Sequence, residues 1–137
     1  MNQLEEALRE QIEYCINFNR YKAAIFVSDT SKINKINEIL KKENEANLQL
    51  QIIKYRFTER EMFVEFSNGS YMKIFQPSEN CRGYKFNGCI VDADIRQDVK
   101  DCIIHPIIMP RLIKFDDGRI EFEDWSETKK RIVEVEI

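Results

Sequence analysis

The sequence predicts an α/β fold, a layered sheet with helices and antiparallel hairpin additions. Two segments carry apolar residues at helical spacing, and two short apolar runs, Ala23–Val27 and Cys89–Val91, have the uniform character of strands buried on both faces. Two turn sequences, Ser67–Ser70 and Asp116–Gly118, each separate a pair of strand-like segments. The resulting order of helix, strand, helix, strand, hairpin and strand is typical of a sheet with helices packed on it.

Both helices in the first half of the chain are predicted from amphipathic patterns. The first covers residues 3–18, and its apolar positions are Leu4, Leu8, Ile12, Cys15 and Ile16. The second covers residues 33–45 and follows the capping segment Asp29–Ser31. After it, apolar residues alternate with glutamines at residues 48–52, which predicts a half-buried strand.

The strongest turn signal is Asn68-Gly69, between the strands predicted at residues 62–66 and 71–75. We expect a two-residue turn in which both central residues have positive φ. Such a turn places Phe66 opposite Tyr71 and gives each face of the hairpin both apolar and polar side chains. The hairpin is therefore expected to be partly covered on both sides.

The last third of the chain, residues 95–137, is predicted to be β-rich and to form a single domain with residues 1–94. Within it, residues 98–104 are expected to form a short helix or turn, followed by a second hairpin around Asp116–Gly118. The final segment, Arg131–Ile137, alternates apolar and charged residues as a strand does. This strand either closes the sheet or pairs with the edge of a neighbouring chain, which would give self-association or a protein contact.

The composition argues against several functional classes. Of 137 residues, 43% are hydrophobic and 33% charged, as in a globular domain rather than a disordered chain. The net charge of −3 argues against binding nucleic acid mainly through electrostatics. The N-terminus has no signal-peptide pattern and no run of about 18 apolar residues occurs, so we expect a cytoplasmic protein without a membrane span. The four cysteines form no Cys-x-x-Cys pair, which favours free thiols over a zinc site.

The order of several short motifs resembles that of a known family. Val64–Ser70 contains an Asn-Gly-Ser hairpin, Arg82-Gly83 follows it, and Cys89–Asp92 is an apolar strand that ends in aspartate. Together with the helix at 3–18 and the strand and turn at Ala23–Thr30, these motifs resemble the ATPase domain of phage terminase large subunits, relatives of the superfamily 2 helicases. The resemblance covers residues 1–94. It implies a P-loop-NTPase-like sheet, a phage or prophage origin, and a role in DNA packaging in the host-cell cytoplasm.

Two departures from the family pattern bear on catalysis. The chain contains no Gly-x-x-x-x-Gly-Lys-Ser/Thr phosphate loop, whose backbone amides and lysine hold nucleotide phosphates. Ala93 follows Asp92, where the family carries the glutamate that positions the attacking water. Because phosphoryl transfer depends on positioning and charge stabilisation, we expect no ATP hydrolysis and no cofactor. The leading hypothesis is a degenerate, non-catalytic terminase-like domain that binds proteins as a packaging subunit, regulator or inhibitor.

An alternative is a small metal-dependent nuclease or nucleotide-processing enzyme. Asp92 and Asp94 lie on the same side if the strand continues, so they can share a Mg²⁺ ion. The simpler interpretation is that they cap the turn after the strand. Arg82, Lys85 and Arg96 flank the same strand end and are candidates for contact with phosphate or a partner.

A third hypothesis is a module that binds single-stranded nucleic acid. Aromatic residues near the predicted hairpin interleave with basic ones, and aromatic side chains on a sheet can stack on bases. The same residues are also typical of a protein core. The aromatic residues are Phe57, Phe63, Phe66, Tyr71, Phe75 and Phe86, and the basic residues are Lys54, Arg56 and Lys73.

Overall fold

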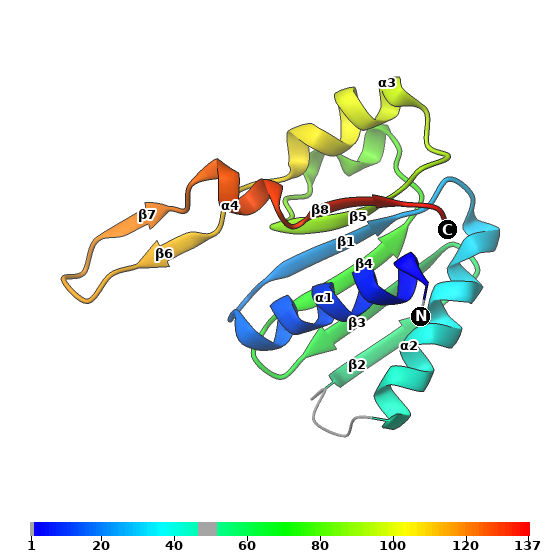
Figure 1. Cartoon of the computed structure of the whole chain (residues 1–137), viewed down its shortest axis with the longest axis horizontal. Coiled ribbons are helices and arrows are strands. Elements are labelled where there is room, and N and C mark those ends of the chain that lie inside the picture. The colour runs from blue at the N-terminus through cyan, green and yellow to red at the C-terminus, as the bar shows by residue number, and fades with distance from the viewer. Residues whose placement is uncertain (1, 47–51) are drawn as a thin grey trace.

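Within residues 2–46 and 52–137, which the computed structural model describes, six strands form one mixed sheet in the order β2-β3-β4-β1-β5-β8 (Figure 1). The α/β class is therefore confirmed. β4, β1, β5 and β8 are parallel, whereas β3 is antiparallel to both β2 and β4. The strand bounds are β1 Lys22–Phe26, β2 Ile52–Phe57, β3 Glu61–Phe66, β4 Tyr71–Phe75, β5 Gly88–Asp92 and β8 Ile132–Val135. The strand predicted at 48–52 lies outside the described residues except for Ile52, which begins β2.

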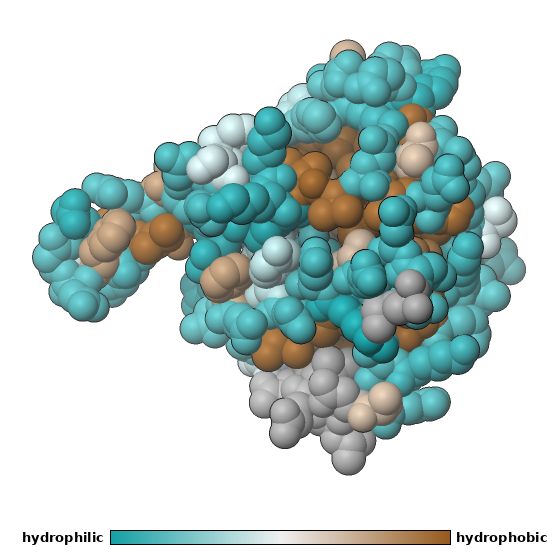
Figure 2. Space-filling model, viewed as in Figure 1, coloured by the Kyte–Doolittle hydropathy of each residue, from teal (hydrophilic) through white to brown (hydrophobic). Residues whose placement is uncertain are grey.

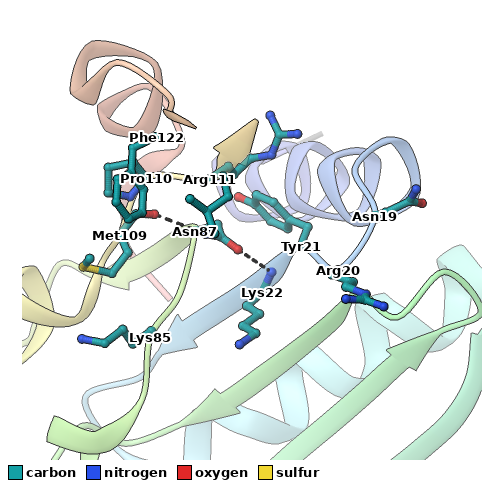
Figure 3. Close-up of a pocket in the computed structure, with 11 residues that line it drawn as sticks. Asn19, Arg20, Tyr21, Lys22, Lys85, Asn87, Met109, Pro110, Arg111 and Phe122 are labelled. Atoms are coloured by element: carbon teal, nitrogen blue, oxygen red, sulfur yellow. Dashed lines mark hydrogen bonds between the residues drawn. The ribbon is translucent and has the colours of Figure 1, made fainter. Parts of the chain in front are cut away.

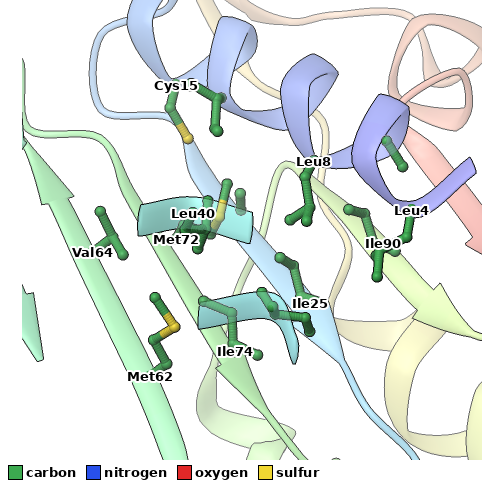
Figure 4. Close-up of a cluster of buried hydrophobic side chains, with 14 of the residues drawn as sticks. Leu4, Leu8, Cys15, Ile25, Leu40, Met62, Val64, Met72, Ile74 and Ile90 are labelled. Atoms are coloured by element: carbon green, nitrogen blue, oxygen red, sulfur yellow. The ribbon is translucent and has the colours of Figure 1, made fainter. Parts of the chain in front are cut away.

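The two predicted amphipathic helices are present, and both cover the same face of the sheet (Figure 1). They are α1 (Gln3–Asn17) and α2 (Ile33–Ala46). Figure 4 shows Leu8 of α1 and Leu40 of α2 gathered with sheet side chains such as Ile25 and Met72. All four side chains are buried, so burial of the apolar stripes of both helices stabilises this layer.

Short helical turns cover the opposite face. They are η3 (Glu79–Gly83), α3 (Gln97–Val99), the π-helical turn η4 (Lys100–Ile104) and η5 (His105–Ile107). The prediction of a short helix or turn at residues 98–104 is confirmed. Ile104 packs there in a second core with Phe26 and Phe86, whose rings meet edge to face at 5.9 Å. The sheet is thus covered by helical segments on both faces.

The β3–β4 hairpin is present, but its predicted two-residue turn is wrong. The Phe66 N–H donates to the Ser70 carbonyl over 2.8 Å, so the loop has three residues and Glu65 lies opposite Tyr71. Only Gly69 in this loop has positive φ, at 86°. The one-residue change of register places the fully apolar side of the hairpin against the α1–α2 face, so the predicted assignment of side chains to faces is also wrong. The residues on that side are Met62, Val64, Phe66, Met72 and Ile74.

The Asn-Gly-Ser sequence of this hairpin holds the end of α1. Asn68 Nδ2 donates to the carbonyl oxygens of Cys15 at 2.8 Å and Phe18 at 3.3 Å. Ser70 Oγ donates to the Phe18 carbonyl at 2.7 Å and accepts from the Tyr21 N–H at 3.0 Å. These bonds supply partners for carbonyl groups that a helix leaves unpaired at its C-terminus. The motif therefore has a structural role.

The C-terminal third of the chain leaves the sheet and then returns to it. β6 (Leu112–Lys114) and β7 (Ile120–Phe122) form a separate two-stranded ribbon that projects from the sheet in Figure 1. We call residues 111–123 the arm. The chain then forms α4 (Trp125–Lys129), which was not predicted, and ends in β8 beside β5. The final strand is confirmed as a strand of the sheet, at its edge, and residues 95–137 contain helical turns as well as strands.

Candidate functional site

A cluster of polar groups lies where β1 and β5 end. Asp92 is the last residue of β5, and its side chain is fully buried. Its Oδ2 accepts hydrogen bonds from the Ser28 N–H at 2.8 Å and from Lys32 Nζ at 2.9 Å. Its Oδ1 accepts from the Asp94 N–H at 3.1 Å. The carboxyl edge of a parallel sheet is where ligands of α/β proteins commonly bind.

Lys32 bridges the two carboxylates that the sequence singled out. Besides its bond to Asp92, its Nζ donates to Asp94 Oδ2 at 2.9 Å. The hydrogen bonds to Asp92 and Asp94 raise the pKa of Lys32. Burial raises the pKa of Asp92, but the hydrogen bonds from Ser28 and Lys32 outweigh it and lower that pKa to about 2. The Lys32 ammonium is therefore the counter-ion of this carboxylate pair.

This arrangement does not fit Mg²⁺ as it stands. Lys32 Nζ occupies the position between Asp92 and Asp94 that a shared cation would need. Within residues 2–46 and 52–137, no three or more His, Cys, Asp or Glu side chains are grouped so as to hold a metal ion. Metal binding by Asp92 and Asp94 stays a prediction, and it requires Lys32 to move away.

Lys32 reaches this site from the turn η1 (Thr30–Lys32), which leads into α2. Asp29 caps the turn by accepting a hydrogen bond from a backbone N–H at 2.8 Å, as expected for a capping aspartate. Sequence reasoning identified Asp92 but missed Ser28 and Lys32. Ser28 directly follows the apolar run Ala23–Val27, and Lys32 lies a few residues further on, at the end of η1.

The three residues predicted to contact phosphate or a partner are not brought together. Lys85 precedes β5 and Arg96 follows it, so they lie at opposite ends of a strand roughly 15 Å long. Arg96 pairs with Asp98 at 3.1 Å and Arg82 pairs with Glu79 at 2.7 Å, both on the surface. Lys85 and Arg96 therefore do not flank the same strand end, and contact of Arg82, Lys85 or Arg96 with phosphate or a partner stays a prediction.

A basic pocket lies at the other edge of the sheet, where β1 and β5 begin (Figure 3). Its volume is about 600 Å³, and it adjoins the base of the arm. Asn87 connects its walls, since Oδ1 accepts from the Lys22 N–H at 3.1 Å and Nδ2 donates to the Met109 carbonyl at 3.3 Å. The described residues that line it include four cations and no carboxylate. The cations are Arg20, Lys22, Lys85 and Arg111.

A buried ion pair fixes the base of the arm beside this pocket. Glu123 and Arg131 are hydrogen-bonded, and both side chains are only 5% exposed. Glu123 Oε1 also accepts from Thr128 Oγ1 and from the Arg111 N–H, each at 2.9 Å. Burial raises the pKa of Glu123, but the bonds from Arg131 and Arg111 outweigh it, so the pKa is lowered. The Glu123 N–H donates to the Arg111 carbonyl at 2.9 Å, which joins the two ends of the arm.

Three of the six aromatic residues considered for nucleic-acid binding belong to the core. Phe66, Phe75 and Phe86 are buried. Phe63 and Tyr71 are half-buried on the sheet face that points away from α1 and α2, with ring centroids 5.4 Å apart. The core interpretation therefore holds for the three buried rings, and nucleic-acid binding stays a prediction.

Comparison with known proteins does not place the chain in a family. No family model matches the sequence, and no curated protein and no solved structure matches it either. Among the described residues, no helix is long and apolar enough to cross a membrane. Function is therefore inferred from the Asp92 cluster, the basic pocket and the arm.

Lys32→Met is expected to remove much of the stability that the Asp92 carboxylate contributes. The pKa of Asp92 is about 2 in the folded protein, against an ordinary value of 3.8. Above about pH 4 the ionised Asp92 carboxylate therefore stabilises the fold by about 2 kcal/mol. This contribution is lost as the pH falls from about 4 to about 2. Without Lys32, only the hydrogen bonds from Ser28 and Asp94 oppose the effect of burial, so the pKa of Asp92 should be higher than in the wild type. The variant should therefore be less stable than the wild type at neutral pH and approach it in acid.

Urea unfolding over a range of pH measures this difference. Lys35→Met, at an exposed position of α2, is the matched control and should follow the wild type throughout. A constant difference between Lys32→Met and wild type at every pH would contradict the assignment of Lys32 as the counter-ion of Asp92.

Proposed function

We propose that the chain is a non-catalytic terminase-like domain, of phage or prophage origin, that acts by binding another protein through its arm. In DNA packaging it would serve as a subunit, a regulator or an inhibitor. The arm supports the proposal that the chain binds a protein, and the Asp92 cluster supports the proposal that it is not catalytic.

The arrangement of the elements supports the resemblance. α1, β1, α2, the β3–β4 hairpin and β5 follow one another in the order that the motifs imply, and β5 ends in Asp92. β1 and β5 are adjacent and parallel, with helical segments on both faces, which is compatible with a P-loop-NTPase-like layering. The hydrogen bonds of Asn68 and Ser70 to the end of α1 explain why the hairpin motif occurs together with that helix.

The Asp92 cluster supports a role without catalysis. In nucleotide hydrolysis, an aspartate at the end of such a strand helps to hold the magnesium ion. Here Lys32 forms ion pairs with both Asp92 and Asp94, and Ala93 offers no carboxylate to position a water. A nuclease that used Asp92 and Asp94 would have to displace the same lysine.

The arm is the observation that carries the binding proposal. Leu112, Ile120 and Phe122 are 61%, 62% and 62% exposed. Figure 2 shows apolar residues of the arm among hydrophilic ones, on a ribbon that stands away from the sheet. A two-stranded hairpin alone is marginally stable in water, and clustered exposed apolar side chains mark interaction sites. A protein that covers the arm would bury this surface.

Affinity capture from a lysate of the source organism, with the purified chain as bait, tests the arm. The triple replacement Leu112→Ser, Ile120→Ser and Phe122→Ser should reduce partner capture by about tenfold or more, because it removes the apolar contact surface. Ile53→Ser is the matched control, since Ile53 on β2 is 64% exposed and distant in sequence from the arm. A partner that the triple variant retains as well as the wild type does would contradict binding through the arm.

The non-catalytic half of the proposal is tested by activity. Purified wild-type protein with Mg²⁺ should neither hydrolyse ATP nor cleave DNA. Turnover that Asp92→Asn abolishes would overturn this half of the proposal.

A further inference from the structure

One face of the arm is mainly apolar, whereas the other combines the apolar residues Ile113 and Phe115 with the charged residues Arg119 and Glu121. Side chains alternate along each strand, so the cross-strand pairs Leu112–Phe122 and Lys114–Ile120 share one face. Lys114 is the single charged residue among these four, and its alkyl stem can cover its apolar neighbour. On the other face, Arg119 pairs with two carboxylates, at 2.7 Å and 3.2 Å, and its guanidinium lies over the Phe115 ring, 4.7 Å from the ring centroid. The apolar side chains of the first face are therefore the more exposed, at 61–62% for Leu112, Ile120 and Phe122 against 37% for Phe115.

The apolar face continues into the basic pocket, because Leu112 and Phe122 line both. Figure 3 shows Phe122 and Arg111 on one side of the pocket and Arg20 and Lys22 on the other. Three of the four cations form no ion pair with the described residues. They are Arg20, Lys22 and Lys85. The pocket therefore offers positive charge beside an apolar wall.

The tip of the arm carries the opposite charge. Asp116 and Asp117 lie in the turn between β6 and β7. Asp117 pairs with Arg119, whereas Asp116 forms no ion pair or hydrogen bond within the described residues. The extended strand separates Asp116 from Leu112 by roughly 13 Å, so the tip cannot enter the pocket at its own base. The tip and the pocket of one copy therefore cannot pair with each other.

We propose that the partner of the arm is a second copy of this chain, and that the two copies exchange arms. This inference rests on the proposed function and names the partner. The apolar faces of the two arms pack against each other in antiparallel fashion, and Asp116 of each copy enters the basic pocket of the other. Each contact is then made twice about a two-fold axis, as in other isologous dimers.

Both the charges and the apolar surface favour the arm of a second copy as the occupant of the pocket. The tip supplies the anion that the pocket lacks, and the arm supplies apolar side chains that match the wall formed by Leu112 and Phe122. Ile120 lies between base and tip, so the two Ile120 side chains come together near the axis. A free phosphate would satisfy the cations but would leave the apolar face uncovered.

Sedimentation equilibrium of the full chain tests this dimer. The wild type should associate with increasing concentration. Asp116→Lys, or the pair Lys22→Glu and Lys85→Glu, should each raise the dissociation constant about tenfold or more, because like charges then face each other. An equal mixture of the two charge-reversed proteins should dimerise again, since opposite charges meet in both contacts. Ile120→Ser should weaken the dimer, and Ile53→Ser should not.

The outcomes separate this inference from the proposed function. A wild-type protein that stays monomeric at all concentrations would overturn the arm exchange. So would a dimer that is insensitive to the arm and pocket variants, which would point instead to the edge strand β8. In either case the proposed function survives if the capture experiment retrieves a different protein through the arm, and it fails if nothing is captured in an arm-dependent way. Circular dichroism of each variant confirms that the fold is retained.

Discussion

Glu123→Ala is expected to lower the free energy of unfolding by about 3–5 kcal/mol, the usual cost of removing one member of a buried ion pair. Arg131, only 5% exposed, would keep its charge without a carboxylate partner. Two further donors, the Thr128 hydroxyl and the Arg111 N–H, would lose their acceptor at the same time. The loss should appear in chemical denaturation monitored by circular dichroism.

Glu121→Ala is the matched control for this change. Glu121 lies on the arm only two residues away, but its pair with Arg119 is on the surface, so its loss should cost less than about 1 kcal/mol. The Glu123 variant should also lose the dimer, because Glu123 joins the two ends of the arm. Stability equal to that of Glu121→Ala would contradict the role given to the buried pair.

The elements with a strong periodic pattern could be predicted from the sequence. Leu4, Leu8 and Ile12 defined the first helix, and the uniform apolar run at 23–27 defined β1. The hairpin at Asn68-Gly69 was predictable, but its register was not. Register depends on whether one or both turn residues take positive φ, and only Gly69 does. The pattern of apolar residues at 62, 64 and 66 would have indicated the correct faces.

The candidate site was predicted incompletely, because its members come from distant segments. Asp92 could be identified at the end of its strand, but Lys32 could be found only by knowing that β1 and β5 are neighbours. Lys85 and Arg96 were predicted to lie at the same end of one short strand, but they lie at its opposite ends. Because β1 and β5 are parallel, the polar residues that follow each strand lie together at one edge of the sheet.

The arm shows a different limit of sequence reasoning. Leu112, Ile120 and Phe122 have the composition of core residues, and nothing local indicates that their hairpin projects away from the sheet. The ion pair at its base joins Glu123 and Arg131, which are separated in sequence by α4. A helix of five residues gives too weak a periodic signal for prediction, so the ion pair was missed with it.

Gly88→Ala is expected to lower the free energy of unfolding by about 3 kcal/mol, because the added methyl group overfills a packed site and disturbs a buried hydrogen bond. A Cβ at this position would overlap Tyr21 Oη and lie 3.0 Å from Arg131 Cβ. Tyr21 is 1% exposed and donates to Gln11 Oε1 at 3.1 Å, so its ring cannot move aside without losing that bond. Thermal and urea unfolding measure the loss. Gly83→Ala, where a Cβ would meet no atom within 4 Å, should change stability little.

A double-mutant cycle with Tyr21→Phe identifies the source of the strain. Phenylalanine lacks the oxygen that the new methyl group would overlap, so Gly88→Ala should cost at least about 1 kcal/mol less in that background. An equal cost in both backgrounds would place the strain at Arg131 and contradict the role of Tyr21. Tyr21 also lines the basic pocket, so its displacement in Gly88→Ala should weaken self-association. Recovery of the dimer in the double variant would then connect the packing around Gly88 to the pocket that receives the partner's arm.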